Sequence, residues 1–223
     1  MQSLLVPVIA VDGPSASGKG TVAQRVAAAL GFHYLDSGAL YRLAALAAAR
    51  AGVSWDDENA VATVAQTLDV KFEGEHILLS GSDVSTAIRT ESIGVGASKV
   101  AAFAQVRAAL LERQRAFAHV PGLVADGRDM GSVVFPQAPL KVFLTASAAV
   151  RAERRYKQLL GRGEAADLGA ITADLEARDA RDRARSVAPL KQLPDAHLLD
   201  TSAMDVDAAV KQILDWWYVA NRR

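Results

Sequence analysis

The stretch that decides the fold spans residues 13–21 and reads Gly13-Pro14-Ser15-Ala16-Ser17-Gly18-Lys19-Gly20-Thr21. An apolar run at residues 6–11 precedes it and is typical of a buried strand, and an alanine-rich helical pattern at 22–30 follows it. Strand, glycine-rich turn and helix form the context in which backbone N–H groups and a helix N-terminus enclose an anion. The stretch therefore predicts a phosphate-binding loop whose Lys19 reaches the β- and γ-phosphates of a nucleoside triphosphate.

One position of the loop departs from the usual pattern. Gly20 stands where such loops usually have the Ser or Thr that holds Mg²⁺, and the hydroxyl comes one residue later, at Thr21. We therefore expect no metal ligand from the chain itself, with Mg²⁺ held mainly through water and substrate oxygens. An ordinary glycine-rich turn between a strand and a helix is the alternative interpretation of the stretch.

The composition bounds the class of protein. A length of 223 residues fits one α/β domain with room for insertions, and 25 basic residues balance 25 acidic ones. No global field therefore attracts nucleic acid or an anionic membrane surface. The absence of cysteine excludes disulfides and thiolate metal sites. Without a basic signal start or a membrane-spanning apolar run, we expect a cytoplasmic protein.

Strand and helix patterns alternate along the chain and predict a parallel sheet with helices on both faces. After the first helix, strands are expected at 32–35, 123–125, 141–146 and 197–200, and helices at 38–51, 57–68, 98–119, 150–160, 171–186 and 205–220. The helix at 98–119 is expected to bend near Phe103. The expected N-caps of three of these helices are Ser37, Asp56 and Asp205.

A small antiparallel insert interrupts this alternation. Residues 70–79 predict two strands around a glycine turn, and residues 83–85 a third short strand. The pairs Gly81-Ser82 and Gly94-Val95 are interpreted as loops of this insert.

Three polar motifs follow predicted strands: the loop at 13–21, Asp36-Ser37 and Asp126-Gly127-Arg128-Asp129. Ligands of parallel sheets bind beyond the carboxyl ends of the strands, so these motifs are expected to converge. Arg128 is suited to a phosphate and Asp129 to a donor such as an exocyclic amine. A turn with local salt bridges is the alternative for this motif.

Two sets of arginines lie at helical spacing. Three arginines and one carboxylate fall within one arc of about 100° on the last predicted helix but one: Arg178, Arg181, Asp182 and Arg185. A solvated, salt-bridged face is the alternative, but the phosphate loop favours an anion-binding surface. Arg151, Arg154 and Arg155 also share a face. The segment from Arg155 to Gly169 is a candidate lid that excludes water, and a purely structural role is equally compatible with it.

With these residues assembled, the chain resembles the bacterial cytidylate kinases nearly end to end. The matching blocks are Val11-Asp12-Gly13-Pro14-Ser15 with Gly18-Lys19-Gly20-Thr21, Leu35-Asp36-Ser37-Gly38-Ala39 with Tyr41-Arg42, Ala97-Ser98 with Val100-Ala101-Ala102-Phe103, Ala125-Asp126-Gly127-Arg128-Asp129-Met130-Gly131, and Arg178-Asp179 with Arg181-Asp182-Arg183, ending at Ala188-Pro189-Leu190. The family often has glycine where this chain has Ala16.

The resemblance implies a P-loop NTPase fold in a single domain at 1–223. It implies a core at 1–36, 104–150 and 187–223, a monophosphate-binding region at about 37–103 with the small antiparallel sheet, and a lid at about 155–170. The implied activity is transfer of a phosphoryl group from ATP to CMP or dCMP, giving ADP and CDP or dCDP, by a monomer that binds nucleotides and neither nucleic acid nor membrane.

The resemblance also implies roles for individual residues. Gly13, Pro14, Ser15, Ala16, Ser17, Gly18, Lys19, Gly20 and Thr21 would hold ATP. The catalytic candidates are Lys19, Arg128, Arg181 and Arg185. The candidates for reading the cytosine are Ser98, Arg107 and Asp129, and those for the sugar hydroxyls are Arg178 and Asp182. The candidates for the acceptor phosphate are Arg42, Arg128 and Arg185, with Ser37 beside the nucleotide. Lid arginines, with Arg155 and Arg162 as candidates, would neutralise developing charge.

Two other functions stay open at the level of sequence. One is a kinase of UMP or of another small acceptor, and the other is a non-catalytic switch driven by NTP hydrolysis. The Asn-Lys-x-Asp run that reads guanine in GTP switches is absent from the sequence.

Overall fold

The computed structural model describes residues 6–73 and 76–221, which form two compact units. The first unit comprises residues up to Leu35 and from Phe117 onward, and the second runs from Asp36 to Ala116. Within the described residues, no helix is long and apolar enough to span a membrane.

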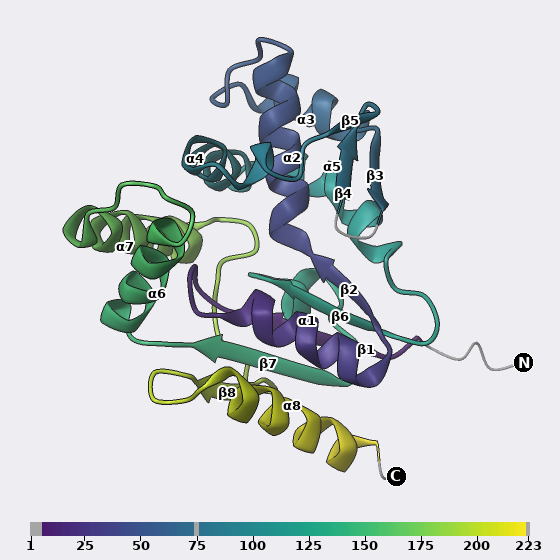
Figure 1. Cartoon of the computed structure of the whole chain (residues 1–223). Helices are drawn as coiled ribbons and strands as arrows, with labels where there is room; N and C mark the ends of the chain where they lie inside the picture. The colour runs from purple at the N-terminus through teal and green to yellow at the C-terminus, as the bar shows by residue number, and fades with distance from the viewer. Residues whose placement is uncertain (1–5, 74–75, 222–223) are drawn as a thin grey trace, which may run out of the picture. The chain divides into compact units, whose positions relative to one another are not determined.

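The first unit is built on a five-stranded sheet in the order β2-β6-β1-β7-β8 (Figure 1). Its strands are β1 (Val8–Asp12), β2 (His33–Asp36), β6 (Leu123–Gly127), β7 (Leu140–Thr145) and β8 (His197–Asp200). β1 pairs in parallel with β6 and with β7, and β7 pairs in parallel with β8. The predicted parallel sheet is confirmed.

The order of the strands fixes the position of a ligand crevice. β1 comes first along the chain but lies in the middle of the sheet, so the chain leaves it toward β2 and β6 on one side and toward β7 and β8 on the other. In open parallel sheets the crevice lies at the carboxyl end of the strand where this reversal occurs. In this unit that strand is β1, which ends at Asp12, just before the phosphate-binding loop.

Helices α1 (Lys19–Leu30) and α8 (Val206–Ala220) pack against each other and on the sheet. The central strands are buried along their whole length, as near-continuous apolar runs predict for parallel strands. Their side chains form one core with both helices, which includes Ile9, Val26, Leu144 and Ile213. Asp205 caps α8 by accepting from the Ala208 N–H, as predicted.

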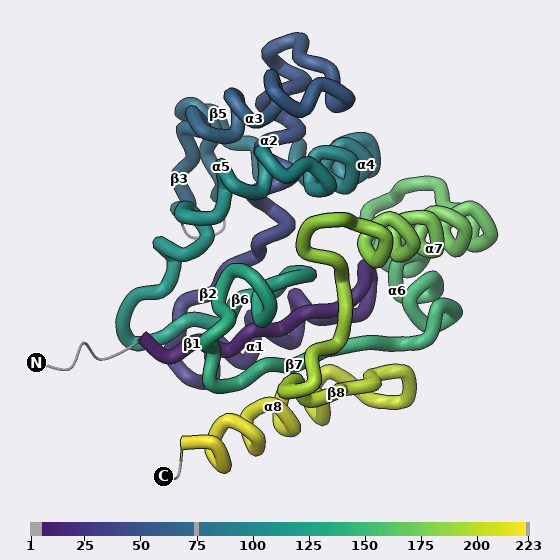
Figure 2. Tube along the Cα trace, turned by 180° about the vertical axis from the view of Figure 1, so that it is seen from behind, coloured from purple at the N-terminus to yellow at the C-terminus, as the bar shows by residue number. Residues whose placement is uncertain are grey.

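Helices α6 (Ala148–Leu160) and α7 (Leu168–Ala184) follow β7 and pack together near its carboxyl end (Figure 1). A five-residue π-helical turn, η2 (Met130–Val134), follows β6 and was not predicted. From behind, Figure 2 shows the chain running from α7 across the strands of the sheet to β8. α6 and α7 therefore lie at the edge of the sheet where the crevice is expected.

The second unit combines helices with the small antiparallel sheet that the sequence predicted. The sheet order is β3 (Val70–Glu73), β4 (His76–Leu79) and β5 (Ser82–Asp83), with both pairings antiparallel. The turn between β3 and β4 lies outside the described residues. The helices are α2 (Ser37–Arg50), α3 (Glu58–Gln66), the 3₁₀ turn η1 (Ala87–Arg89), α4 (Glu91–Val100) and α5 (Ala104–Arg115).

Two of the predicted caps are wrong by one residue. Asp36, and not Ser37, caps α2, because its carboxylate accepts from the Ala39 N–H at 3.1 Å. Asp57, and not Asp56, caps α3 by accepting from the Ala60 N–H. In both places two adjacent residues can cap a helix, and the position of the first helical turn decides which of them does so.

The helix predicted at 98–119, with a bend near Phe103, is divided into two helices, α4 and α5, and Phe103 is the N-cap of α5. α4 begins at Glu91, so the interpretation of Gly94-Val95 as a loop is wrong. Neighbouring side chains leave little room for a Cβ at the two glycines of this helix. A Cβ at Gly96 would lie 2.6 Å from the Trp55 ring, and one at Gly94 would lie 3.1 Å from the Arg42 guanidinium. α5 packs on α3 inside the second unit, whereas the sequence assigned residues 104–116 to the core.

Candidate active site

The phosphate-binding loop follows β1 directly and leads into α1, which begins at Lys19. Gly13 has no room for a side chain, because a Cβ there would lie 2.0 Å from the Leu144 carbonyl oxygen in β7. Gly18 is the N-cap of α1 with a φ of 90°, a conformation that glycine adopts without strain. The loop therefore brings N–H groups of the first helical turn to the crevice, which suits an anion.

Ala16 is also left-handed, with a φ of 58°. A methyl group makes this conformation unfavourable by about 1–2 kcal/mol, so the loop holds strain at this position. The resembled family often has glycine at the position of Ala16, and the left-handed backbone of this chain favours glycine there as well.

Replacing Ala16 with glycine is expected to raise the free energy of unfolding by about 0.5–1 kcal/mol, because the strain relieved exceeds the added entropy of an unfolded glycine. Urea denaturation measures the change. Ser80→Gly is the matched comparison, since Ser80 is also left-handed, with a φ of 50° in the second unit, and a gain of the same sign is expected there. A less stable Ala16→Gly protein would contradict the prediction.

Two arginines of α6 hold the carbonyl side of the loop. Arg151 donates from Nη1 to the Ser15 carbonyl at 3.1 Å, and Arg154 donates from Nη1 to the Ser17 carbonyl at 2.9 Å. Arg154 also donates to the hydroxyl and the carbonyl of Thr201, which follows β8. Of the two roles that the sequence left open for these arginines, these contacts favour the structural one, since both guanidinium groups bind backbone carbonyls of the loop.

The rest of the candidate lid has a different setting. Arg155 is half-buried and donates to the side chain of Gln158, one turn further along α6. Arg162 is exposed in the turn between α6 and α7, which begins with Asp167 as its N-cap. The lid at 155–170 remains a prediction.

Arg128 connects the loop with α7. Its Nη2 donates to the Ser15 hydroxyl at 2.7 Å, and its Nε pairs with Asp182 Oδ2 at 2.8 Å. Arg185 pairs with the other oxygen of the same carboxylate. The structure therefore brings together four predicted site residues, Ser15, Arg128, Asp182 and Arg185, which lie far apart in the sequence.

Electrostatics ties a fifth predicted residue to this group. Burial of Asp182 opposes its ionisation, but the charges of Arg128, Arg185 and Arg178 outweigh burial and hold the pKa of the Asp182 carboxyl below its ordinary value. The charges of three guanidinium groups thus act on one carboxylate, and all four groups belong to the predicted site. Arg181 lies on the same helix with an exposed side chain.

Two further carboxylates lie behind the loop. Asp12, the last residue of β1, accepts from the Met130 and Gly131 N–H groups at 2.8 and 2.9 Å. Burial raises the pKa of Asp12 to about 6; the two N–H groups oppose the rise, and the nearby charge of Asp129 adds to it. Asp129 is itself only 3% exposed. Asp12 thus fixes the backbone immediately after Asp129.

The raised pKa of Asp12 predicts a pH-dependent stability. Between about pH 4 and pH 6 the folded protein keeps the proton that the unfolded chain releases, so this group stabilises the fold at low pH, and the contribution is lost as the pH rises through 6. Its full size is about 3 kcal/mol. Urea denaturation across this range, for the natural protein and for Asp12→Asn, measures it. A difference between the two proteins that does not change with pH would contradict the assignment.

Asp126 borders the loop at the position where a metal-binding hydroxyl is usual. It accepts from the Tyr34 hydroxyl at 3.1 Å, and a Cβ at Gly20 would lie 3.1 Å from its Oδ2. Asp126 therefore takes the space that a Ser or Thr side chain at position 20 would need. Among the described residues, no group of three or more His, Cys, Asp or Glu side chains is arranged to hold a metal ion.

The second unit carries the remaining predicted residues. Arg42 on α2 donates to the Ile88 carbonyl at 2.8 Å and lies against Gly94 of α4. Arg107 on α5 is buried, donates to the Ala101 carbonyl at 3.0 Å and lies 5.5 Å over the ring of Tyr41. Ser37 and Ser98 are buried at the start of α2 and late in α4. Each of these side chains is held in place by its own unit.

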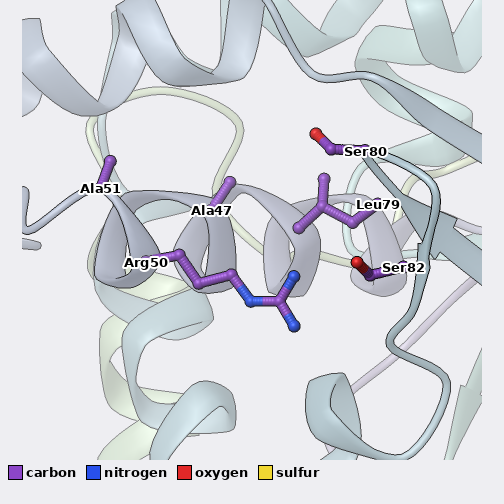
Figure 3. Close-up of a pocket in the computed structure, with 6 residues that line it drawn as sticks. All are labelled: Ala47, Arg50, Ala51, Leu79, Ser80 and Ser82. Atoms are coloured by element: carbon purple, nitrogen blue, oxygen red, sulfur yellow. The ribbon is translucent and has the colours of Figure 1, made fainter.

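A cavity of about 300 Å³ opens elsewhere on the second unit (Figure 3). It is lined by Ala47, Arg50, Ala51, Leu79, Ser80 and Ser82, none of which is a predicted site residue. Arg50 is the one titratable side chain among them, so this cavity lacks the converging groups that phosphoryl transfer requires.

Sequence reasoning missed the roles of Asp12, Arg151 and Arg154. Asp12 stood inside the first matching block, directly after the apolar run at 6–11, and was given no role of its own; its partners are backbone groups of residues more than a hundred positions away. The spacing of Arg151 and Arg154 was recognised, but a guanidinium donates equally well to phosphate and carbonyl oxygens, so the spacing alone did not identify the acceptors.

Comparison with known proteins agrees with this geometry. The family model for cytidylate kinase matches residues 9–218. The chain is 62% identical over 214 residues to the cytidylate kinase of Chromobacterium violaceum, covering 96% of each protein. It is 59% identical to that of Ralstonia nicotianae, covering 95% of this chain and 92% of the relative, and 61% identical to that of Neisseria meningitidis serogroup C, covering 94% and 96%. A chain with a phosphate-binding loop on a parallel sheet, matched over nearly its whole length, belongs to the cytidylate kinase family.

Proposed function

We propose that this protein transfers the γ-phosphoryl group of ATP to CMP or dCMP, giving ADP and CDP or dCDP. An oxygen of the acceptor phosphate forms a bond to the γ-phosphorus while the bond from that phosphorus to the bridging β-oxygen breaks, and the bonding electrons leave with ADP. The acceptor phosphate is already a competent nucleophile near neutral pH, so the enzyme's task is to position two anions and to stabilise charge.

The observation that carries the proposal is the contact set of Arg128. One guanidinium group joins Ser15 of the phosphate-binding loop to Asp182 of α7, where Arg185 pairs with the same carboxylate. Cationic groups that serve an acceptor phosphate are thereby anchored to the loop that serves the donor. Phosphoryl transfer needs this arrangement, whereas a loop that only binds a triphosphate does not.

In the first unit, we propose that residues 13–21 hold ATP, and that their backbone N–H groups, which Pro14 lacks, and the Lys19 ammonium bind its phosphates. Arg128 and Arg185 bind the acceptor phosphate and, with Arg181, neutralise charge that develops during transfer. Arg178 and Asp182 bind the sugar hydroxyls, and Asp129 accepts from the exocyclic amine of cytosine.

In the second unit, Arg42 is proposed to bind the acceptor phosphate and Ser37 to lie beside the nucleotide. Ser98 and Arg107 are proposed to read the base. Support for these roles is positional likeness to the family, together with the burial of Ser98 and Arg107 and the hydrogen bond from Arg107 to the Ala101 carbonyl. The protein is proposed to act as a monomer on free nucleotides and not on nucleic acid.

Mg²⁺ is proposed as the metal that accompanies ATP. The residues at the loop fit an ion held largely by water and phosphate oxygens, because Asp126 borders Gly20 and offers an oxygen where the usual hydroxyl is missing. Asp126 and Thr21 are the residues that would contact its water shell. When bound, the ion would supply charge neutralisation at the β- and γ-oxygens.

The test is release of ADP from ATP in the presence of CMP, dCMP, UMP or no acceptor. Release that depends on CMP or dCMP is the expected result. UMP-dependent release that equals or exceeds it would indicate a different acceptor specificity. Release without any acceptor would favour an NTP-driven switch.

A further inference from the structure

Ser15 of the phosphate-binding loop is held from two sides by arginines. Arg128 donates to its hydroxyl at 2.7 Å, and Arg151 donates to its carbonyl at 3.1 Å. Each arginine also pairs with an aspartate of α7: Arg128 with Asp182 at 2.8 Å, and Arg151 with Asp179 at 2.7 Å. The two aspartates are three residues apart, on one face of the helix. Two parallel bridges therefore run from α7 to one residue of the loop.

The Arg151 bridge is buried along its length. The side chains of Arg151 and Asp179 are 7% and 4% exposed, and Arg151 Nε also donates to the Ala146 carbonyl at 3.1 Å. One guanidinium group thus joins three parts of the first unit: the loop after β1, the end of β7 and α7. Because its donors lie in a rigid plane, these three acceptors are held at fixed positions relative to one another.

Stability alone is a weak reason for such a pair. Removing two charges from water costs several kcal/mol, and apolar residues of similar volume often stabilise a core as well or better. Asp179 Oδ1 has no hydrogen-bond partner among the residues that the structure describes, so the carboxylate is not optimally satisfied. The pair instead fixes the distance between the loop and the helix segment that carries Arg178, Asp182 and Arg185.

We infer that Arg151 and Asp179 are a positioning pair, which sets the acceptor-binding groups of α7 against the donor-binding loop without touching either substrate. This inference rests on the proposed function, because α7 matters only if its charged groups bind the acceptor. A displacement of about 1 Å between reacting groups lowers a rate by about 100-fold, so the pair acts on catalysis through distance.

Two substitutions test the pair. Arg151→Lys keeps a positive charge beside Asp179, but a single ammonium does not reproduce the planar donors that span three acceptors. Asp179→Asn keeps the shape of the side chain and removes the ion pair. Each is expected to lower kcat about 30- to 100-fold and to raise KM for CMP. The double variant is expected to lose no more than either single variant, because both remove the same bridge.

Arg154→Lys is the matched control, since Arg154 lies one turn further along α6 and binds a loop carbonyl, but its hydrogen bonds go to Ser17 and Thr201. It is expected to raise KM for ATP while KM for CMP stays unchanged. Melting temperatures are measured for all variants, and kinetics are measured well below them. This comparison separates a loss of fold from a loss of position.

The outcomes are distinct. Arg151→Lys and Asp179→Asn proteins that melt earlier but keep kcat and KM would overturn the inference, as would additive losses in the double variant or the same profile from Arg154→Lys. If the natural protein itself releases no ADP in response to CMP or dCMP, the proposed function fails and the inference with it. Normal turnover of the natural protein with unchanged variants contradicts the positioning pair alone.

Discussion

Replacing Lys19 with methionine is expected to lower kcat by about 10²–10³-fold, while CMP still binds with nearly its natural affinity. Lys19 is the first residue of α1, directly after the left-handed Gly18, and its ammonium lies 3.4 Å from the Pro14 carbonyl at the other end of the loop. The ammonium group is therefore held over the loop, where it can contact the phosphates that the amides bind.

The effect should fall on turnover because charge on the transferred group grows in the transition state, and a cation beside it stabilises that state more than the bound substrates. Methionine keeps the length and the apolar stem of the side chain and removes only the charge. CMP is proposed to depend on other groups, among them Arg128 and Arg185, which contact Asp182.

Steady-state kinetics and calorimetry with CMP measure the two quantities separately. Lys211→Met is the matched control, since Lys211 is exposed on α8, pairs with Asp215 and lies outside the proposed site. The control should leave kcat unchanged. Lost CMP binding in Lys19→Met would contradict the division of labour between the loop and the arginines of the acceptor side.

The part of the fold that the sequence predicted well is the part that local chemistry determines. The loop at 13–21 needs glycine at Gly13, where β7 leaves no room, and at Gly18, where the backbone is left-handed. Both requirements are met by residue type alone, so the pattern identifies the strand, the turn and the helix without knowledge of the rest of the chain.

Predictions failed where a distant neighbour decided the local structure. Gly94 and Gly96 resemble loop residues in sequence, yet both lie inside α4. Arg42 and Trp55 occupy the space that side chains at these two positions would need. No local pattern contains those partners, which are about 40 to 50 positions away in the chain. Tertiary packing overrides propensity at such positions.

In the candidate site, too, local spacing predicted one part, and contacts between distant residues decided the other. The stripe with Arg178, Asp182 and Arg185 was predicted from helical spacing, and the structure shows Asp182 between Arg128 and Arg185. The sequence did not predict that Arg128 joins this stripe to Ser15. Ser15, Arg128 and Asp182 come from different elements, and the order of the strands decides whether these elements meet.

The second large effect is expected for substrate choice. Replacing Asp129 with alanine should reduce the preference for CMP over UMP, measured as the ratio of kcat/KM values, by at least about 100-fold, with a smaller loss of kcat for CMP. Cytosine presents an amine donor at the position where uracil presents a carbonyl acceptor. A carboxylate pairs with the first and repels the second, so its removal should weaken CMP and relieve UMP.

The setting of Asp129 makes this discrimination strong. The side chain is only 3% exposed, and its charge is felt by buried Asp12, whose pKa it helps to raise. A buried carboxylate left without a donor is costly, and this cost is what a site of this kind uses to reject the wrong base. Water would otherwise solvate the carboxylate and reduce the penalty that UMP incurs.

Asp129→Asn provides the graded comparison, because an amide keeps the shape and presents either an acceptor to cytosine or a donor to uracil. Its preference should lie between that of the natural protein and equality, or should invert toward UMP. Asp195→Ala, which removes an exposed aspartate paired with Lys141, is the control that should leave the preference intact. If Asp129→Ala keeps the natural ratio while remaining folded, then Asp129 does not read the base, and the specificity must come from the second unit, where Ser98 and Arg107 are the remaining candidates.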